Sequence, residues 1–198
     1  MKVYSGGFTA ERLYRPEVKI IVDLQLQGYN KDEIREKVFN DNLLQCRSAA
    51  AIKDIFPRVY RRANYLDETL KTMLLNGSRS DQNALLLYPF LKHFAFPQEL
   101  VMELIHYNKK MYKDIITDGN VESFIDEKAE HYESVRNWTD KTRYKIKQVT
   151  LKILTDAELL VKDGKEYKIT AIPLSRDLQQ YVQHHEQYKD LLAYTLND

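Results

Sequence analysis

Cysteine, glycine and proline are all scarce in this chain, and each shortage narrows the possible folds. The single cysteine, Cys46, excludes an intramolecular disulfide, which fits a reducing compartment. No histidine lies near Cys46 in the sequence and Leu43 and Leu44 precede it, so we expect a buried structural thiol rather than a nucleophile. With six glycines and five prolines in 198 residues, few positions interrupt a helix, and the composition favours a mainly α-helical protein.

A charge excess and a long apolar run are also missing. Lys and Arg number 30 against 29 Asp and Glu, so any nucleic-acid function has to rest on where the basic residues lie. The most apolar segment, residues 84–96, is interrupted by polar residues and falls short of the ~20 apolar residues of a membrane span. The first ten residues lack the apolar core of a signal peptide. We therefore expect a cytoplasmic protein with no membrane partner.

Helix caps and breakers predict a series of helices in the first part of the chain. Pro16 suits the first turn of one helix, and Asn30 suits the cap of the next. Ser48 caps a further helix, and Pro57 then starts a new helix or kinks that one. Three more helices are expected, over residues 67–75, 80–95 and 97–116. These helices lead us to assign residues 1–118 to a multi-helix N-terminal body.

The remaining residues, 119–198, combine helices with one β-hairpin. A turn is expected at Asp118-Gly119-Asn120, then a helix over residues 121–135. Thr139 caps a helix that reaches about residue 155. Two β-prone segments, residues 158–162 and 165–169, flank Asp163-Gly164, a dipeptide typical of a tight hairpin. A closing helix is expected from the cap residue Ser175 to Tyr194.

A helix that runs into a tight hairpin is typical of the second half of a winged-helix module. In such a module one helix enters the DNA major groove. Lys141, Lys145 and Lys152 fall within a stripe of roughly 40° on the predicted helix. Ammonium groups placed in this way neutralise phosphates and release counterions. The candidate DNA-binding residues of the module are Thr139, Lys141, Thr142, Arg143, Lys145, Lys147, Lys152, Lys162, Lys165 and Lys168. The alternatives are a solvated helix face and a module that binds protein.

A second basic cluster lies in the N-terminal body and consists of Arg47, Lys53, Arg58, Arg61 and Arg62. The last three have i, i+3, i+4 spacing, so one face of a helix presents them together. Arginine suits bidentate contact with phosphate or guanine. The alternative is a set of intramolecular salt bridges to carboxylates such as Asp54 or Glu68.

Signals for catalysis are missing from the sequence. The glycine pair in Ser5-Gly6-Gly7 lacks the Lys-Ser/Thr that completes a phosphate-binding loop. His184 and His185 are adjacent, so on a helix their side chains point about 100° apart and do not share a metal ion. We expect no enzyme activity, no metal, no cofactor and no small-molecule substrate.

Several segments together resemble the BrxA family of BREX bacteriophage-resistance systems. They are Tyr4-Ser5-Gly6-Gly7-Phe8-Thr9-Ala10, Leu13-Tyr14, Arg58-Val59-Tyr60-Arg61-Arg62, the apolar pair 84–105 and the module 139–169. The resemblance implies a mainly α fold with helix-turn-helix-like elements, the later one winged. It also implies double-stranded DNA binding without catalysis, in phage defence beside methyltransferase, ATPase and phosphatase partners. The body of this family is also similar to the NusB helical fold.

Three functional hypotheses follow. The first is a non-enzymatic duplex-DNA-binding component of a BREX system. The second is a protein-interaction adaptor within the defence complex, which the near-neutral charge and 14 tyrosines also fit. The third is RNA binding, which rests on the analogy with NusB-like folds alone.

Overall fold

The computed structural model describes residues 4–198, and the first three residues of the segment that lacks a signal-peptide core lie outside this range. The predicted fold class is confirmed, because most of the described chain is helical and a hairpin follows the predicted helix.

The helices are α1 (Arg15–Leu26), α2 (Lys31–Asn40), α3 (Ala49–Ala63), α4 (Glu68–Asn76), α5 (Arg79–His93), α6 (Ala95–Glu99), the π-helix η1 (Leu100–His106), α7 (Tyr107–Lys110), α8 (Asp118–His131), α9 (Glu133–Arg136), α10 (Asp140–Asp156), α11 (Arg176–His184), the 3-10 helix η2 (Glu186–Tyr188) and α12 (Asp190–Tyr194). The strands are β1 (Ile115–Thr117), β2 (Leu160–Asp163) and β3 (Glu166–Ile169).

Side-chain caps fix the starts of many helices, as the sequence predicts. The Asn30 side chain accepts hydrogen bonds from the backbone N–H groups of Asp32 and Glu33, and Glu33 completes a capping box. Ser48, Asp67, Thr139 and Ser175 cap α3, α4, α10 and α11 in the same way. Each cap satisfies backbone donors that have no partner within the helix.

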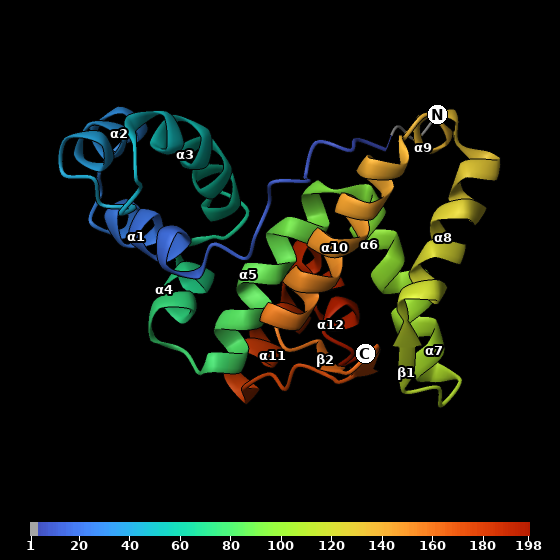
Figure 1. Cartoon of the computed structure of the whole chain (residues 1–198). Helices are drawn as coiled ribbons and strands as arrows, with labels where there is room; N and C mark the ends of the chain where they lie inside the picture. Colours follow the sequence, from blue (N-terminus) through green and yellow to red (C-terminus); the bar gives the residue numbers. More distant parts are fainter. Residues whose placement is uncertain (1–3) are drawn as a thin grey trace.

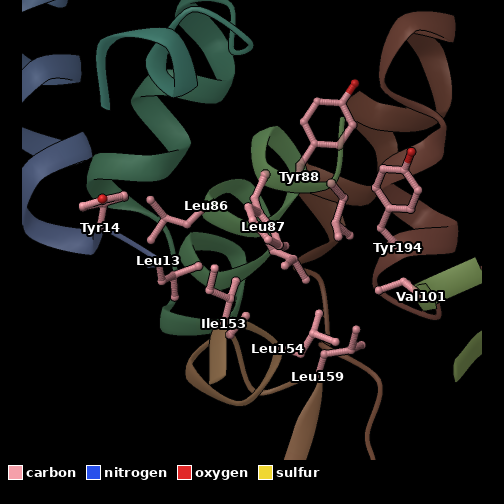
Figure 2. Packing of buried hydrophobic residues seen from close by; sticks show 14 of the residues in the cluster. Leu13, Tyr14, Leu86, Leu87, Tyr88, Val101, Ile153, Leu154, Leu159 and Tyr194 are labelled. Atoms are coloured by element: carbon pink, nitrogen blue, oxygen red, sulfur yellow. The ribbon is translucent and has the colours of Figure 1, made fainter. Parts of the chain in front are cut away.

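Helices α1 to α4 gather at one side of the molecule, and α8 lies at the opposite side, with α5 and α10 between them (Figure 1). Helix α5 is the central element, since residues 83–91 are all buried. Figure 2 shows Leu86 and Leu87 of α5 in one cluster with Leu13 and Tyr14 of the N-terminal segment and with Ile153 and Leu154 of α10. One apolar core therefore includes residues from both ends of the chain.

The small sheet is antiparallel with strand order β1-β3-β2. In the register, Ile116 and Lys162 both lie opposite Tyr167, while Ile115 and Val161 both lie opposite Lys168. Because side chains alternate between the two faces of a strand, Tyr167 and Lys168 point to opposite faces of the sheet. Gly164 turns the hairpin with φ +57°, a left-handed conformation that glycine adopts without strain.

Four local expectations are wrong. The predicted helix over residues 97–116 ends at Lys110, and Ile115–Thr117 is a strand because it pairs with β3, about fifty residues later. The residues of Asp118-Gly119-Asn120 form the first turn of α8, because Thr117 caps that helix. The expected helix over residues 121–135 breaks at Tyr132, whose backbone is extended. The closing helix breaks at His185 for the same reason.

Two further residues can now be placed. Of the two alternatives for Pro57, the start of a new helix is excluded, because α3 runs through it from Ala49 to Ala63. Cys46 is half-buried rather than buried, with its Sγ 3.8 Å from the backbone oxygen of Leu44. Among residues 4–198, no helix is long and apolar enough to cross a bilayer.

Candidate nucleic-acid interface

Helix α10 separates its apolar and basic residues onto different sides. Ile146, Thr150, Ile153 and Leu154 are fully buried against the core. Lys141, Lys145 and Lys152 are exposed. Helical spacing sets this separation, since Lys141, Lys145 and Lys152 lie within roughly 40° of one another around the axis. At 1.5 Å per residue, these lysines extend over about 16 Å of helix.

The exposed lysines of α10 differ in what they contact. Within residues 4–198, Lys141 and Lys145 make no ion pair, so their charges remain available to a ligand. Lys152 is 3.2 Å from the Asp156 carboxylate one turn later, and its side chain is 71% exposed. An exposed i, i+4 pair of this kind is weak, so a phosphate can compete for Lys152.

The hairpin places its three lysines differently. Lys162 lies on the same face of the sheet as Tyr167, with its Nζ 5.8 Å from the centre of that ring. Lys165 lies at the hairpin turn and is exposed. Lys168 is also exposed, but it lies on the other face of the sheet, beside Ile115 and Val161. Of these three lysines, Lys162 lines the groove that α10 also lines.

A groove of about 640 Å³ lies between α10 and the hairpin. Lys145 and Lys152 line it from the helix, and Lys162 and Tyr167 line it from the strands. Tyr144 and Gln148 add polar groups on the helix side, joined by a 2.7 Å hydrogen bond from Gln148 Nε2 to the Tyr144 hydroxyl. Three carboxylates, from Glu11, Asp118 and Asp156, also line the groove, so its cationic character depends on the exposed lysines.

Two of the predicted basic residues on α10 are committed to the protein itself. Lys147 is 7% exposed, and its Nζ lies 2.5 Å from Glu122 and 3.5 Å from Asp118. Burial lowers the pKa of Lys147, but the hydrogen bond to Glu122 and the charge of Asp118 outweigh it and leave the pKa above its ordinary value. Arg143 pairs with Asp126 at 2.8 Å. Both residues join α10 to α8.

The two predicted threonines serve the start of α10. The Thr139 hydroxyl accepts a hydrogen bond from the Thr142 backbone N–H at 3.2 Å, and the two hydroxyls lie 2.9 Å apart. The Thr142 side chain is half-buried and packs beside Gly6. These contacts explain both residues as parts of a helix cap.

The arginine cluster of α3 is mostly paired within the protein. Arg62 is 1% exposed, lies 2.5 Å from the Glu11 carboxylate and donates a 3.1 Å hydrogen bond to the Leu13 carbonyl. Arg58 pairs with Asp54 at 2.7 Å, as the salt-bridge alternative expects. Arg61 lies 3.5 Å from Glu11. The three arginines therefore do not form one open face, and Glu68 is not their partner.

The other two residues of this cluster are exposed. Arg47 lies in the loop before α3, and Lys53 lies on the first half of that helix. Lys53 lines a second hollow, of about 590 Å³, between α2 and α3. Lys31 and Arg35 of α2 line the same hollow and were not among the residues predicted from the sequence. Lys31, Arg35 and Phe39 follow one another at intervals of four residues, and this spacing indicates that they share one face of α2.

No group of three or more His, Cys, Asp or Glu side chains within residues 4–198 is placed to hold a metal ion. His184 and His185 each contact a backbone oxygen one turn earlier in α11, at 2.7 Å. The Nδ1 atom of each ring is thus hydrogen-bonded within the protein.

A mainly α-helical protein with a lysine-bearing helix beside a small antiparallel sheet is the class that the fold and this surface define. The sequence model of the BrxA family matches residues 2–186, and the chain therefore belongs to the BrxA family.

Two relatives agree with this assignment, and a solved structure shares the fold. The chain is 26% identical to a BREX protein BrxA from Bacillus cereus (strain H3081.97) over 181 residues, which cover 91% of this chain and 90% of the relative. It is 21% identical over 186 residues to a BREX protein BrxA from Paramagnetospirillum magneticum, with 93% of each chain covered. The crystal structure of an uncharacterized protein from Magnetospirillum magneticum shares the fold, with a TM-score of 0.77, 18% identity and 98% of each chain covered.

Proposed function

We propose that this chain is a non-enzymatic component of a BREX system that binds duplex DNA in the cytoplasm. The contact surface in this proposal consists of Lys141, Lys145 and Lys152 on α10 and Lys162 and Lys165 in the hairpin. We call it the α10–hairpin surface. The observation that carries the proposal is the exposure of these five lysines, three of which, Lys145, Lys152 and Lys162, line one groove. Duplex affinity is dominated by such phosphate contacts.

The order of elements supports this proposal. Strand β1, helices α8 and α10, and the hairpin β2–β3 follow one another, and β1 pairs with β3. We interpret this order as a winged-helix-like module, with α10 as the helix that enters the groove and the hairpin as the wing. The module in this interpretation begins at β1, because that strand is part of the sheet. The BREX names of the relatives support a role in phage defence.

Several of the other predicted site residues are not part of the contact surface. Arg62, Lys147 and Arg143 are held in ion pairs, and Thr139 and Thr142 cap α10. We leave these five out of the contact surface. Lys168 faces away from the groove, and Arg58 is paired with Asp54. Lys168 and Arg58 are therefore also left out of the contact surface.

Fluorescence anisotropy of a labelled duplex, titrated at several salt concentrations, tests the proposal. Five phosphate contacts give a slope of about −4.5 in log affinity against log salt, and thus a loss of about 500-fold between 50 and 200 mM. Replacing Lys141, Lys145 and Lys152 together with Ala should reduce the slope to about −2. Arg176→Ala is the control, because Arg176 is exposed on α11 outside the surface. An unchanged slope in the triple variant would refute the assignment.

A second candidate function is that of a protein-interaction adaptor. The outer face of the small sheet supports it, because Ile115 and Val161 flank Lys168 there and are 51% and 50% exposed. Exposed apolar groups that lie together are typical of protein-binding surfaces. Co-purification with the other BREX proteins tests this role, with Ile115→Lys and Val161→Lys as the variants. Loss of co-purification without loss of duplex binding in these variants would distinguish this face from the α10–hairpin surface.

A further inference from the structure

The hollow between α2 and α3 collects positive charge. Lys31 and Arg35 of α2 and Lys53 and Arg61 of α3 line it, and no carboxylate from residues 4–198 does. Lys31, Arg35 and Lys53 are exposed and make no ion pair within residues 4–198. Arg61 contacts Glu11 at 3.5 Å through its Nη2, while its Nε is buried and has no hydrogen-bond partner. A site with this charge selects an anion.

Aromatic rings form the floor of the same hollow. Phe56 is buried, and Phe39 and Tyr60 are half-buried around it, with ring centres 6.5 and 5.6 Å from that of Phe56. The Lys31 Nζ lies 5.6 Å from the centre of the Tyr60 ring, and the Arg35 guanidinium lies 5.7 Å from that of Phe39. Positive groups and ring faces are therefore adjacent, and a ligand with a planar ring and an anionic group fits both.

We propose that this hollow binds a nucleotide. The base stacks against Phe39 and Tyr60, and the phosphates contact Lys31, Arg35 and Lys53. Every base offers a π face to an aromatic side chain, and arginine stacks on bases as well. The volume of about 590 Å³ lies within the range of roughly 300–1,000 Å³ that is usual for small-molecule sites.

The nucleotide in this site has an unstacked base, which distinguishes the site from the α10–hairpin surface. In a duplex, each base face is covered by its neighbours, so a base has to leave the stack before a ring can cover it. Two sources supply such a unit, namely a free nucleoside phosphate and an unpaired nucleotide of a DNA strand. This site requires ring stacking, whereas the α10–hairpin surface requires only phosphate contacts, so each proposal can fail without the other.

Isothermal titration calorimetry on the full chain tests the proposal with three probes. They are ATP, inorganic triphosphate and a single-stranded oligothymidylate of eight nucleotides. We expect ATP or the oligonucleotide to bind at least tenfold more tightly than inorganic triphosphate. Binding of ATP alone identifies a free nucleotide as the source, and binding of the oligonucleotide alone identifies a strand. Both results support the proposal. Triphosphate that binds as tightly as either nucleotide probe, or the absence of binding by both, overturns it.

Two sets of variants separate stacking from charge. Lys31→Ala with Arg35→Ala should weaken every anionic probe at least tenfold, and both residues are exposed, so folding is not at risk. Tyr60→Leu should weaken ATP and the oligonucleotide at least tenfold while leaving triphosphate unchanged. Arg176→Ala is the matched control and should leave all three affinities unchanged, because Arg176 is exposed on α11 outside both proposed surfaces. Nucleotide affinity that survives the loss of Lys31 and Arg35 overturns the assignment, whatever the behaviour of Tyr60→Leu.

Discussion

The substitution Glu11→Gln should destabilise the protein strongly, because Glu11 is the counter-charge of a buried arginine. The Glu11 carboxylate lies 2.5 Å from Arg62, 3.5 Å from Arg61 and 3.9 Å from Arg58. Arg62 is 1% exposed, and burial lowers its pKa although the charge of Glu11 acts in the opposite direction. The Arg62 Nε already has no hydrogen-bond partner. The Glu11 carboxylate is therefore the group that compensates the buried charge of Arg62.

The size of the effect follows from what the substitution leaves behind. Gln keeps the shape of Glu and one acceptor oxygen, but Arg62 then carries an uncompensated charge in the core. Breaking a buried ion pair in this way costs about 3–5 kcal/mol. In a chain of this length, each kcal/mol lowers the melting temperature by roughly 2–4 °C, so we expect a decrease of roughly 6–20 °C.

Thermal unfolding followed by circular dichroism at 222 nm measures this decrease. Asp126→Asn is the matched control, because it removes the carboxylate that pairs with Arg143 at a site where the Asp126 side chain is 71% exposed. An exposed pair contributes roughly 0–1 kcal/mol. If Glu11→Gln lowers the free energy of unfolding by less than about 1 kcal/mol, Glu11 is not the group that compensates the charge of Arg62.

Three further predictions concern single residues. Lys145→Ala should weaken duplex binding roughly fivefold at 150 mM salt, measured by anisotropy, whereas Lys147→Met should change it less than twofold. Burial, followed by the charge of Asp190, raises the pKa of Tyr194 to about 12, so stability that is complete below pH 10 should be lost as the pH rises toward 12. Urea unfolding at each pH measures that loss, and Tyr194→Phe should reduce it. Gly164→Ala should cost about 1 kcal/mol in the same assay, because its φ is +57°.

The local elements were predictable because the interactions that start and end them are short. The Asn30, Ser48 and Thr139 caps each bond to a backbone group two or three residues later. Gly164 is a turn residue whose left-handed conformation follows from its lack of a side chain. The face of each lysine in the hairpin was not predicted, because it depends on the pairing register of β2 with β3.

The breaks in the predicted helices depended on contacts that the local sequence does not contain. Residues 115 and 116 fall within the predicted helix 97–116, but with Thr117 they form β1, because they pair with β3. Strand β3 is built from residues about fifty positions later. Tyr132 leaves the helical conformation where its ring packs 4.7 Å from that of Tyr4, about 130 positions earlier.

The sequence by itself determined that basic residues gather on α10, in the hairpin and on α3. Only the tertiary structure decided which of these charges are free. Glu11 reaches Arg62 across 51 residues, and Glu122 reaches Lys147 across 25, so packing brings each carboxylate to its partner. Lys141 and Lys145 have no such neighbour among the described residues. A basic residue in the core needs a counter-charge, whereas one at the surface is solvated and remains available to a ligand.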